Sequence, residues 1–118
     1  MKNKPIDARL HGLFDYAFGG VQLMAPTVLG LNLTAIKNYK LIGAGFSTVN
    51  ALTDTPVGIK PVISLQAHKR IDEVSLISQS FLTLAPFIRN DKRALAFHLL
   101  FLGAAITNYL LTDYKDGE

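Results

Sequence analysis

Residues 94–112 read ALAFHLLFLGAAITNYLLT, and this stretch decides the fold that the chain is predicted to adopt. Up to Leu111, only His98, Thr107 and Asn108 interrupt the apolar residues. At about 1.5 Å rise per residue, a helix of this length matches a hydrocarbon core of roughly 30 Å. A helix on the surface of a soluble bundle needs a polar face, which this stretch almost lacks. A membrane helix is therefore the favoured interpretation, and a soluble four-helix bundle is the alternative.

Three further apolar segments precede this one, at about residues 10–31, 35–53 and 67–88. Each is close to the length that spans a bilayer. The third is the most polar and carries several hydroxyl side chains, which are common where membrane helices pack together. Turn residues separate the segments, including Gly30, Pro56 and Asn90. The sequence thus predicts an all-α fold of four transmembrane helices.

Composition sets the broad class of the protein. The 118 residues are enough for a single membrane domain, with 49% hydrophobic and 18% charged residues and a net charge of +3. These values exclude a disordered chain. The absence of cysteine excludes disulfides, thiolate metal sites and a cysteine nucleophile. Lys and Arg lie in short clusters beside the apolar segments, as at the ends of membrane helices, so the lipid bilayer is the expected partner and nucleic acid is not.

The chain also matches itself in four places. The matches are His11-x3-Asp15 with His68-x3-Asp72, Ala25-Pro26 with Ala85-Pro86, Ala44-x3-Thr48 with Gly103-x3-Thr107, and Leu52-Thr53-Asp54 with Leu111-Thr112-Asp113. Four matches in one order predict a duplicated helical hairpin, with repeats at about residues 9–58 and 66–117. Two hairpins that enter the bilayer from one side are parallel repeats related by a pseudo-twofold axis along the membrane normal. Both termini are then expected on one side, and the count of Lys and Arg there, seven against five, favours the cytoplasmic side.

These motifs carry a family resemblance. The order H-G-x-x-D-Y, A-P-x-x-x-G, L-T-D, A-H-x-x-x-D and A-P, from about residue 9 to 114, resembles small bacterial membrane proteins of the SPW-repeat type. The resemblance implies a duplicated two-helix unit with a proline near a helix end, and no established activity. The chain departs from the family in its signature, which reads Ala25-Pro26-Thr27 and Ala85-Pro86-Phe87 here, and in having no Trp.

Polar residues are expected to collect at the face that carries the termini. His11 and Asp15, like His68 and Asp72, are four residues apart and so share one helix face. Asp54 and Asp113 follow helix ends, where the macrodipole disfavours an anion by roughly 0.3–1 kcal/mol, so a cationic partner is expected for each. The candidate cations are Arg9, Lys69 and Arg70. The sequence predicts one polar ring of His–Asp and Lys/Arg–Asp contacts.

The main interpretation of this ring is a structural clamp between the two hairpins, because charged groups in a bilayer tend to pair. A site for a small ligand, an ion or a proton, and a metal site with imidazole and carboxylate ligands, are the alternatives. Pro26 and Pro86 are expected to stop or kink a helix. No nucleophile motif is present, and neither catalysis nor a cofactor is expected.

The predicted function is a non-enzymatic integral membrane protein, a structural or accessory subunit that packs against itself or another membrane protein. The alternative is a small transporter or an ion-, proton- or metal-binding membrane protein that uses the His/Asp cluster as an oligomer.

Overall fold

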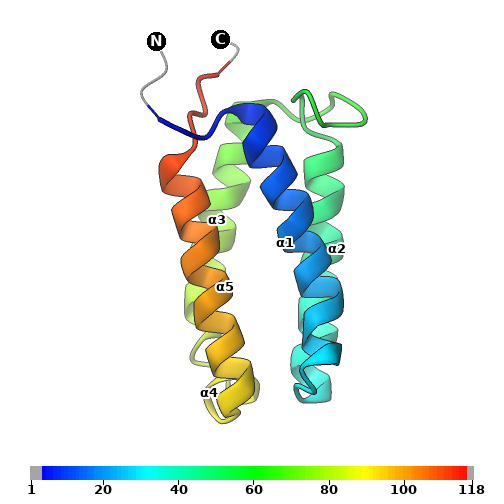
Figure 1. Ribbon diagram of the computed structural model, residues 1–118, viewed down its shortest axis with the longest axis vertical. Helices are drawn as coiled ribbons and strands as arrows, with labels where there is room; N and C mark the ends of the chain where they lie inside the picture. Colours follow the sequence, from blue (N-terminus) through cyan, green and yellow to red (C-terminus); the bar gives the residue numbers. More distant parts are fainter. Residues whose placement is uncertain (1–3, 117–118) are drawn as a thin grey trace.

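The computed structural model describes residues 4–116, which form five α-helices. They are α1 (Ala8–Val28), α2 (Leu33–Ala51), α3 (Leu65–Leu82), α4 (Pro86–Arg89) and α5 (Lys92–Leu111). The four long helices run up and down along one axis, with α1 beside α2 and α5 beside α3 (Figure 1). The short α4 lies at the same end as the α1–α2 turn, and the α2–α3 linker lies at the opposite end with both ends of the described chain.

Each long helix begins at a residue whose side chain caps it. The side-chain oxygens of Asp7, Asn32, Ser64 and Asp91 accept hydrogen bonds from backbone N–H groups in the first turns of α1, α2, α3 and α5. Such caps satisfy donors that have no partner within the helix. The turn after α1 contains Gly30 at φ +66°, a conformation that glycine adopts without steric cost. The sequence therefore fixes where the helices start and where the first pair turns back.

The third apolar segment is not one helix. Residues 67–88 were expected to be continuous, but α3 ends at Leu82 and a separate turn of helix, α4, starts at Pro86. Proline has no N–H and holds the preceding residue away from the helical conformation, and Ala85 is extended at φ −67° and ψ 138°. Pro26 behaves differently, because it lies inside α1, two residues before the helix ends at Val28. The predicted helix stop is correct for Pro86, which separates α4 from α3.

The prediction of four transmembrane helices in two hairpins is wrong. Among the described helices only α5 is long and apolar enough to cross a membrane, with a mean hydropathy of 1.7. The others carry polar groups within their length: Arg9, His11 and Asp15 in α1, two lysines in α2, and a run of charged residues in α3. Apart from Arg9, these polar residues lie inside the predicted apolar segments, and they lower the mean hydropathy of α1, α2 and α3 below that of a membrane span.

Burial is concentrated at the two ends of the bundle. At the α4 end, Leu31, Ala35, Tyr39, Ile88 and Ala94 form a buried apolar core. At the other end, the most buried side chains are polar. Between the two ends, large apolar side chains on the outside of all four long helices are exposed, among them Met24, Leu41, Phe81 and Leu100. On α5, only 28% of the most apolar stretch is buried within the protein.

Candidate metal centre

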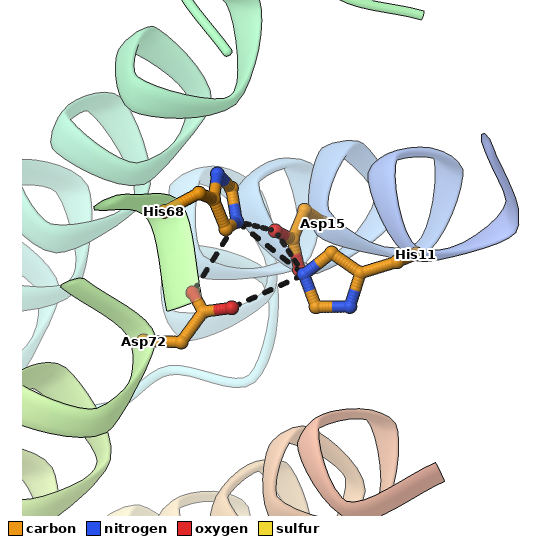
Figure 2. A group of neighbouring side chains, drawn as sticks. All are labelled: His11, Asp15, His68 and Asp72. Atoms are coloured by element: carbon orange, nitrogen blue, oxygen red, sulfur yellow. Dashed lines mark hydrogen bonds and ion pairs between the residues drawn. The ribbon is translucent and has the colours of Figure 1, made fainter. Parts of the chain in front are cut away.

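Four ionisable side chains meet in the interior at the end of the bundle that carries the α2–α3 linker. α1 supplies His11 and Asp15, and α3 supplies His68 and Asp72 (Figure 2). Residues four apart lie on one face of a helix, so each helix presents one imidazole and one carboxylate to the other. We call these four residues the His/Asp cluster. All four are buried, and His11 and His68 are only 2% and 1% exposed.

The imidazole nitrogens and the carboxylate oxygens approach a common centre. The two Nε2 atoms lie 3.3 Å apart. Nε2 of His11 is 3.1 Å from Oδ2 of both Asp15 and Asp72. Nε2 of His68 is 2.9 Å from Oδ2 of Asp15 and 3.4 Å from Oδ1 of Asp72. One ligand atom from each residue can be chosen so that all lie within 4.8 Å of one another.

The far side of each imidazole is held by a threonine. Nδ1 of His11 lies 2.8 Å from Oγ1 of Thr112, and Nδ1 of His68 lies 2.7 Å from Oγ1 of Thr53. Each hydroxyl donates its single proton to the backbone carbonyl four residues earlier, that of Asn108 or of Val49. The hydroxyl oxygen can therefore only accept from the imidazole, which requires a proton on Nδ1. In each histidine, Nε2 therefore either carries the second proton of an imidazolium or has a free lone pair.

The carboxylates are oriented as well. Nδ2 of Asn108 donates to Oδ1 of Asp15 at 3.3 Å, and the hydroxyl of Tyr114 donates to Oδ2 of Asp72 at 2.8 Å. Burial and the negative charge of Asp72 raise the pKa of Tyr114, so its hydroxyl stays protonated and can donate. Each of the four residues is thus fixed by a neighbour outside the cluster.

The threonine contacts cross between the two halves of the chain. His11 near the start of the chain contacts Thr112 near its end, whereas His68 contacts Thr53 of the first half. Backbone bridges follow the same pattern, with Ile6 beside Thr112 and Ile63 beside Thr53. The predicted repeat boundaries, residues 9–58 and 66–117, stay a prediction, and Gly117 lies outside the described residues.

The charges of the cluster explain its protonation. Burial disfavours the imidazolium forms, but hydrogen bonds and charge interactions with Asp15 and Asp72 outweigh it and raise the pKa of both His11 and His68 to about 9. Burial opposes ionisation of Asp72, yet the two histidines lower the pKa of Asp72 to about 2. Two buried negative charges therefore need two positive charges beside them, which two protons or one divalent cation can supply.

The other predicted members of the polar ring lie outside the cluster. Asp54 is exposed in the linker, and Oδ1 of Asp113 accepts a hydrogen bond from the backbone N–H of Lys115. Arg9 and Arg70 are exposed, and Nζ of Lys69 lies 5.9 Å from the ring centroid of Tyr114. Among residues 4–116, neither acid forms an ion pair with these cations. Both acids lie beyond the last residue of a helix, where solvent or backbone groups satisfy them.

Sequence reasoning missed the threonines. The repeated Leu-Thr-Asp motif is identified from the sequence, but its Asp residues, Asp54 and Asp113, are the ones placed in the predicted polar ring. The structure shows that Thr53 and Thr112 are the residues that reach the cluster, and both are completely buried. One pattern could have indicated the threonines: both copies of the motif have Thr immediately before Asp.

Comparison of the chain with family models, with curated proteins and with solved structures finds no match. The resemblance to SPW-repeat proteins therefore stays a prediction, and function must be argued from the cluster itself.

Proposed function

We propose that the protein binds one divalent transition-metal ion through the Nε2 atoms of His11 and His68 and the carboxylates of Asp15 and Asp72. The observation that carries the proposal is the spacing of the ligand atoms. Zn²⁺ binds nitrogen and oxygen at about 2.0–2.2 Å, which places the corners of a tetrahedron about 3.3–3.6 Å apart. The imidazole–imidazole and imidazole–carboxylate distances of the cluster run from 2.9 to 3.4 Å. The four ligand atoms as a set lie within 4.8 Å of one another, so metal binding would also draw the carboxylates of Asp15 and Asp72 closer together.

The surroundings support a metal ligand role. Histidines that bind metals almost always donate their other ring N–H to a fixed acceptor, which orients the ring and selects the tautomer. Thr53 and Thr112 are such acceptors, and their own protons are committed to backbone carbonyls. Two carboxylates with two neutral imidazoles carry a charge of −2, which a divalent cation neutralises. Mixed nitrogen and oxygen ligands suit Zn²⁺, Fe²⁺, Co²⁺ and Mn²⁺ better than Mg²⁺ or Ca²⁺, which prefer oxygen alone.

A structural clamp is the second candidate, and one observation favours it. The four side chains satisfy one another, since each imidazole contacts both carboxylates. With both Nε2 atoms protonated, the cluster would be a buried ion-pair network that holds α1 against α3. Breaking such a network by removing one partner costs several kcal/mol. Metal content separates the two candidates, because only the first predicts a bound ion.

The test is equilibrium dialysis of the chelator-treated protein against Zn²⁺, Co²⁺, Mn²⁺ and Mg²⁺, followed by metal analysis. We expect one Zn²⁺ or Co²⁺ per chain and no tight Mg²⁺. The double variant Asp15→Asn/Asp72→Asn keeps the shape of both side chains but removes their charge, and it should lose metal. The matched control, Asp54→Asn/Asp113→Asn, removes two acids outside the cluster and should bind as the wild type does. If the wild-type protein binds no metal, the metal-binding proposal is contradicted and the structural clamp is the remaining candidate.

We also propose that the protein contacts a lipid bilayer through the exposed side of α5. This helix is apolar along its length, and Leu99, Leu100 and Leu110 expose 51%, 77% and 58% of their surface. Exposed apolar patches of this kind mark membrane or protein contacts. The protein should sediment with membranes after alkaline carbonate extraction, and Leu100→Glu should release a larger fraction than Lys115→Glu. Recovery of the wild type from the soluble fraction would overturn this proposal and leave the metal site untouched.

A further inference from the structure

A small cavity adjoins the His/Asp cluster. Its volume is about 40 Å³, and three cluster residues, His11, Asp15 and Asp72, line it. His68 does not line the cavity. If the four ligand atoms surround a metal, the cavity therefore lies against the triangular face formed by the three lining residues, opposite His68. A ligand in the cavity would approach the metal through this face and become its fifth ligand.

The walls of the cavity are largely apolar. Phe18, Phe46, Leu76, Phe101 and Ala105 line it, with Gln22 and Gln79 among the polar residues that complete the lining. A water molecule needs roughly 10–15 Å³ of such cavity volume, so the cavity holds a ligand of at most a few non-hydrogen atoms. Dry apolar cavities hold nonpolar guests, whereas a water is retained only where polar groups receive it.

One polar group in this cavity has an unused hydrogen-bonding atom. Asn108 is 4% exposed, and its Nδ2 donates to Asp15. Its Oδ1 is buried and has no hydrogen-bond partner within residues 4–116. A buried acceptor without a partner costs about 1–3 kcal/mol. Asn108 lines the cavity on the side of the cluster, so a donor that enters the cavity could satisfy this oxygen.

The charge of the cluster restricts the ligand further. A divalent ion with two carboxylates and two neutral imidazoles has no net charge. An anion added in an apolar cavity would bury an uncompensated negative charge, which is costly. A neutral molecule adds no such charge.

We propose that the cavity holds a water molecule that coordinates the metal opposite His68 and donates a hydrogen bond to Oδ1 of Asn108, and that a neutral diatomic molecule can replace this water. This proposal rests on the metal-binding function proposed above. The site is then an open metal centre, because one coordination position is taken by an external molecule. In a closed structural metal site, the protein supplies every ligand.

The test uses nitric oxide as the neutral probe and azide as its anionic counterpart. The protein is loaded with Fe²⁺ without oxygen, its iron content is measured, and nitric oxide is added. We expect the half-integer-spin electron paramagnetic resonance signal of an iron–nitrosyl adduct at one per bound iron, and at least a tenfold weaker affinity for azide. Failure to bind both Fe²⁺ and Zn²⁺ would overturn the proposed function, whereas binding of Zn²⁺ without Fe²⁺ would overturn the cavity proposal alone. Full iron loading without an adduct would overturn the cavity proposal alone.

Filling the cavity provides the second arm of the test. Ala105→Leu places a larger side chain in the cavity and should abolish the adduct while iron content stays at one per chain. Ala104→Leu is the matched control, because Ala104 is the neighbouring residue on α5 and is exposed. Ala105→Val fills less space and should weaken the adduct if the leucine variant does not fold. Equal adduct formation in Ala105→Val, Ala105→Leu and Ala104→Leu would show that the ligand does not enter through this cavity.

Discussion

Nε2 of His11 lies 3.3 Å from Nε2 of His68, although 57 residues separate the two histidines. Both nitrogens face the same two carboxylates, and the opposite nitrogen of each ring faces a threonine hydroxyl. Both nitrogens can carry protons at this separation because each contacts the carboxylates of Asp15 and Asp72. One divalent cation can replace these two protons, and the predictions below follow from that exchange.

The first prediction concerns the threonines. Thr53→Val and Thr112→Val remove the acceptor of an imidazole N–H and leave the side-chain shape nearly unchanged. Loss of such an outer partner typically lowers metal affinity by about 10–100-fold, and we expect this range for Zn²⁺ in competition with a chelating dye. Thr48→Val and Thr107→Val are matched controls, because these exposed hydroxyls bond only to the carbonyl four residues earlier. Equal affinity in all four variants would show that the threonines do not orient the ligands.

The second prediction concerns the pH dependence of the metal-free protein. Because the pKa of both cluster histidines rises from 6.5 to about 9 on folding, their stabilising contribution is fully present below pH 6.5 and is lost as the pH rises through 9. The pKa of Asp72 falls from 3.8 to about 2, so its contribution is present above pH 3.8 and is lost as the pH falls through 2. The Tm measured with a chelator present should therefore decline between pH 6.5 and 9.

The control for this titration is the third histidine. His98→Gln changes a residue whose ring nitrogens contact Tyr39 and the backbone of Gln79, away from the cluster. It should keep the decline in Tm between pH 6.5 and 9, whereas His11→Gln/His68→Gln should lose it. A decline that persists in the double variant would place its origin elsewhere in the chain.

The third prediction concerns the contact between α1 and α2. A Cβ atom at Gly43 would lie 2.9 Å from the backbone oxygen of Gly19, so Gly43→Ala forces the helices apart. We expect a loss of about 1–3 kcal/mol in the free energy of unfolding, measured by denaturant titration. Gly45→Ala is the control, since a Cβ there meets nothing within 4 Å. The control should be neutral or more stable by up to about 1 kcal/mol, because alanine favours helices. Destabilisation of equal size in both variants would contradict the close contact.

The fourth prediction concerns Asn32, which links the turn between α1 and α2 to α4 and to the start of α5. Its Oδ1 caps α2, and its Nδ2 donates to the carbonyl of Phe87 and to the carboxylate of Asp91. Asn32→Ala removes the cap and both donated bonds, for an expected loss of about 2–3 kcal/mol. Ser64→Ala removes only a cap, that of α3, and should cost about 1 kcal/mol. Chemical denaturation of the two variants measures the difference, and an equal loss would mean that the Nδ2 bonds contribute nothing.

Sequence patterns predicted the helices well and the membrane topology poorly. The apolar segments and the turns between them located the ends of the four long helices to within about three residues, except that α3 ends about six residues before the predicted residue 88. The stop expected at Pro86 is present, but the short helix α4 that starts there is not predicted, since a proline near the end of an apolar run can lie inside a helix, as Pro26 does, or start a new one. The prediction of four spans gives too little weight to the charged residues within the apolar segments, such as Lys37 and Lys40 in α2, and only α5 is apolar enough to cross a membrane among the described helices.

The cluster shows the same division between local and long-range information. The i,i+4 spacing placed His11 beside Asp15 and His68 beside Asp72, which the structure confirms. The predicted polar ring puts the two pairs at one end of the bundle, where α1 and α3 bring them into contact, but it also includes Asp54 and Asp113, which stay outside. The glycines of α1 and α2 illustrate the same point, because a Cβ would meet a neighbouring helix at Gly19 and Gly43 but nothing within 4 Å at Gly20 and Gly45. Which residue of a motif makes the contact depends on the direction in which each side chain points.

The most direct test of the metal centre is calorimetric titration of the chelator-treated protein with Zn²⁺ at pH 7, in buffers of different ionisation enthalpy. At this pH both cluster histidines carry protons on Nε2, because their pKa values are about 9. A metal that binds at these nitrogens must displace both protons, so the account predicts one Zn²⁺ per chain and release of about two protons per ion. Absence of binding, or binding without release of protons, would contradict it.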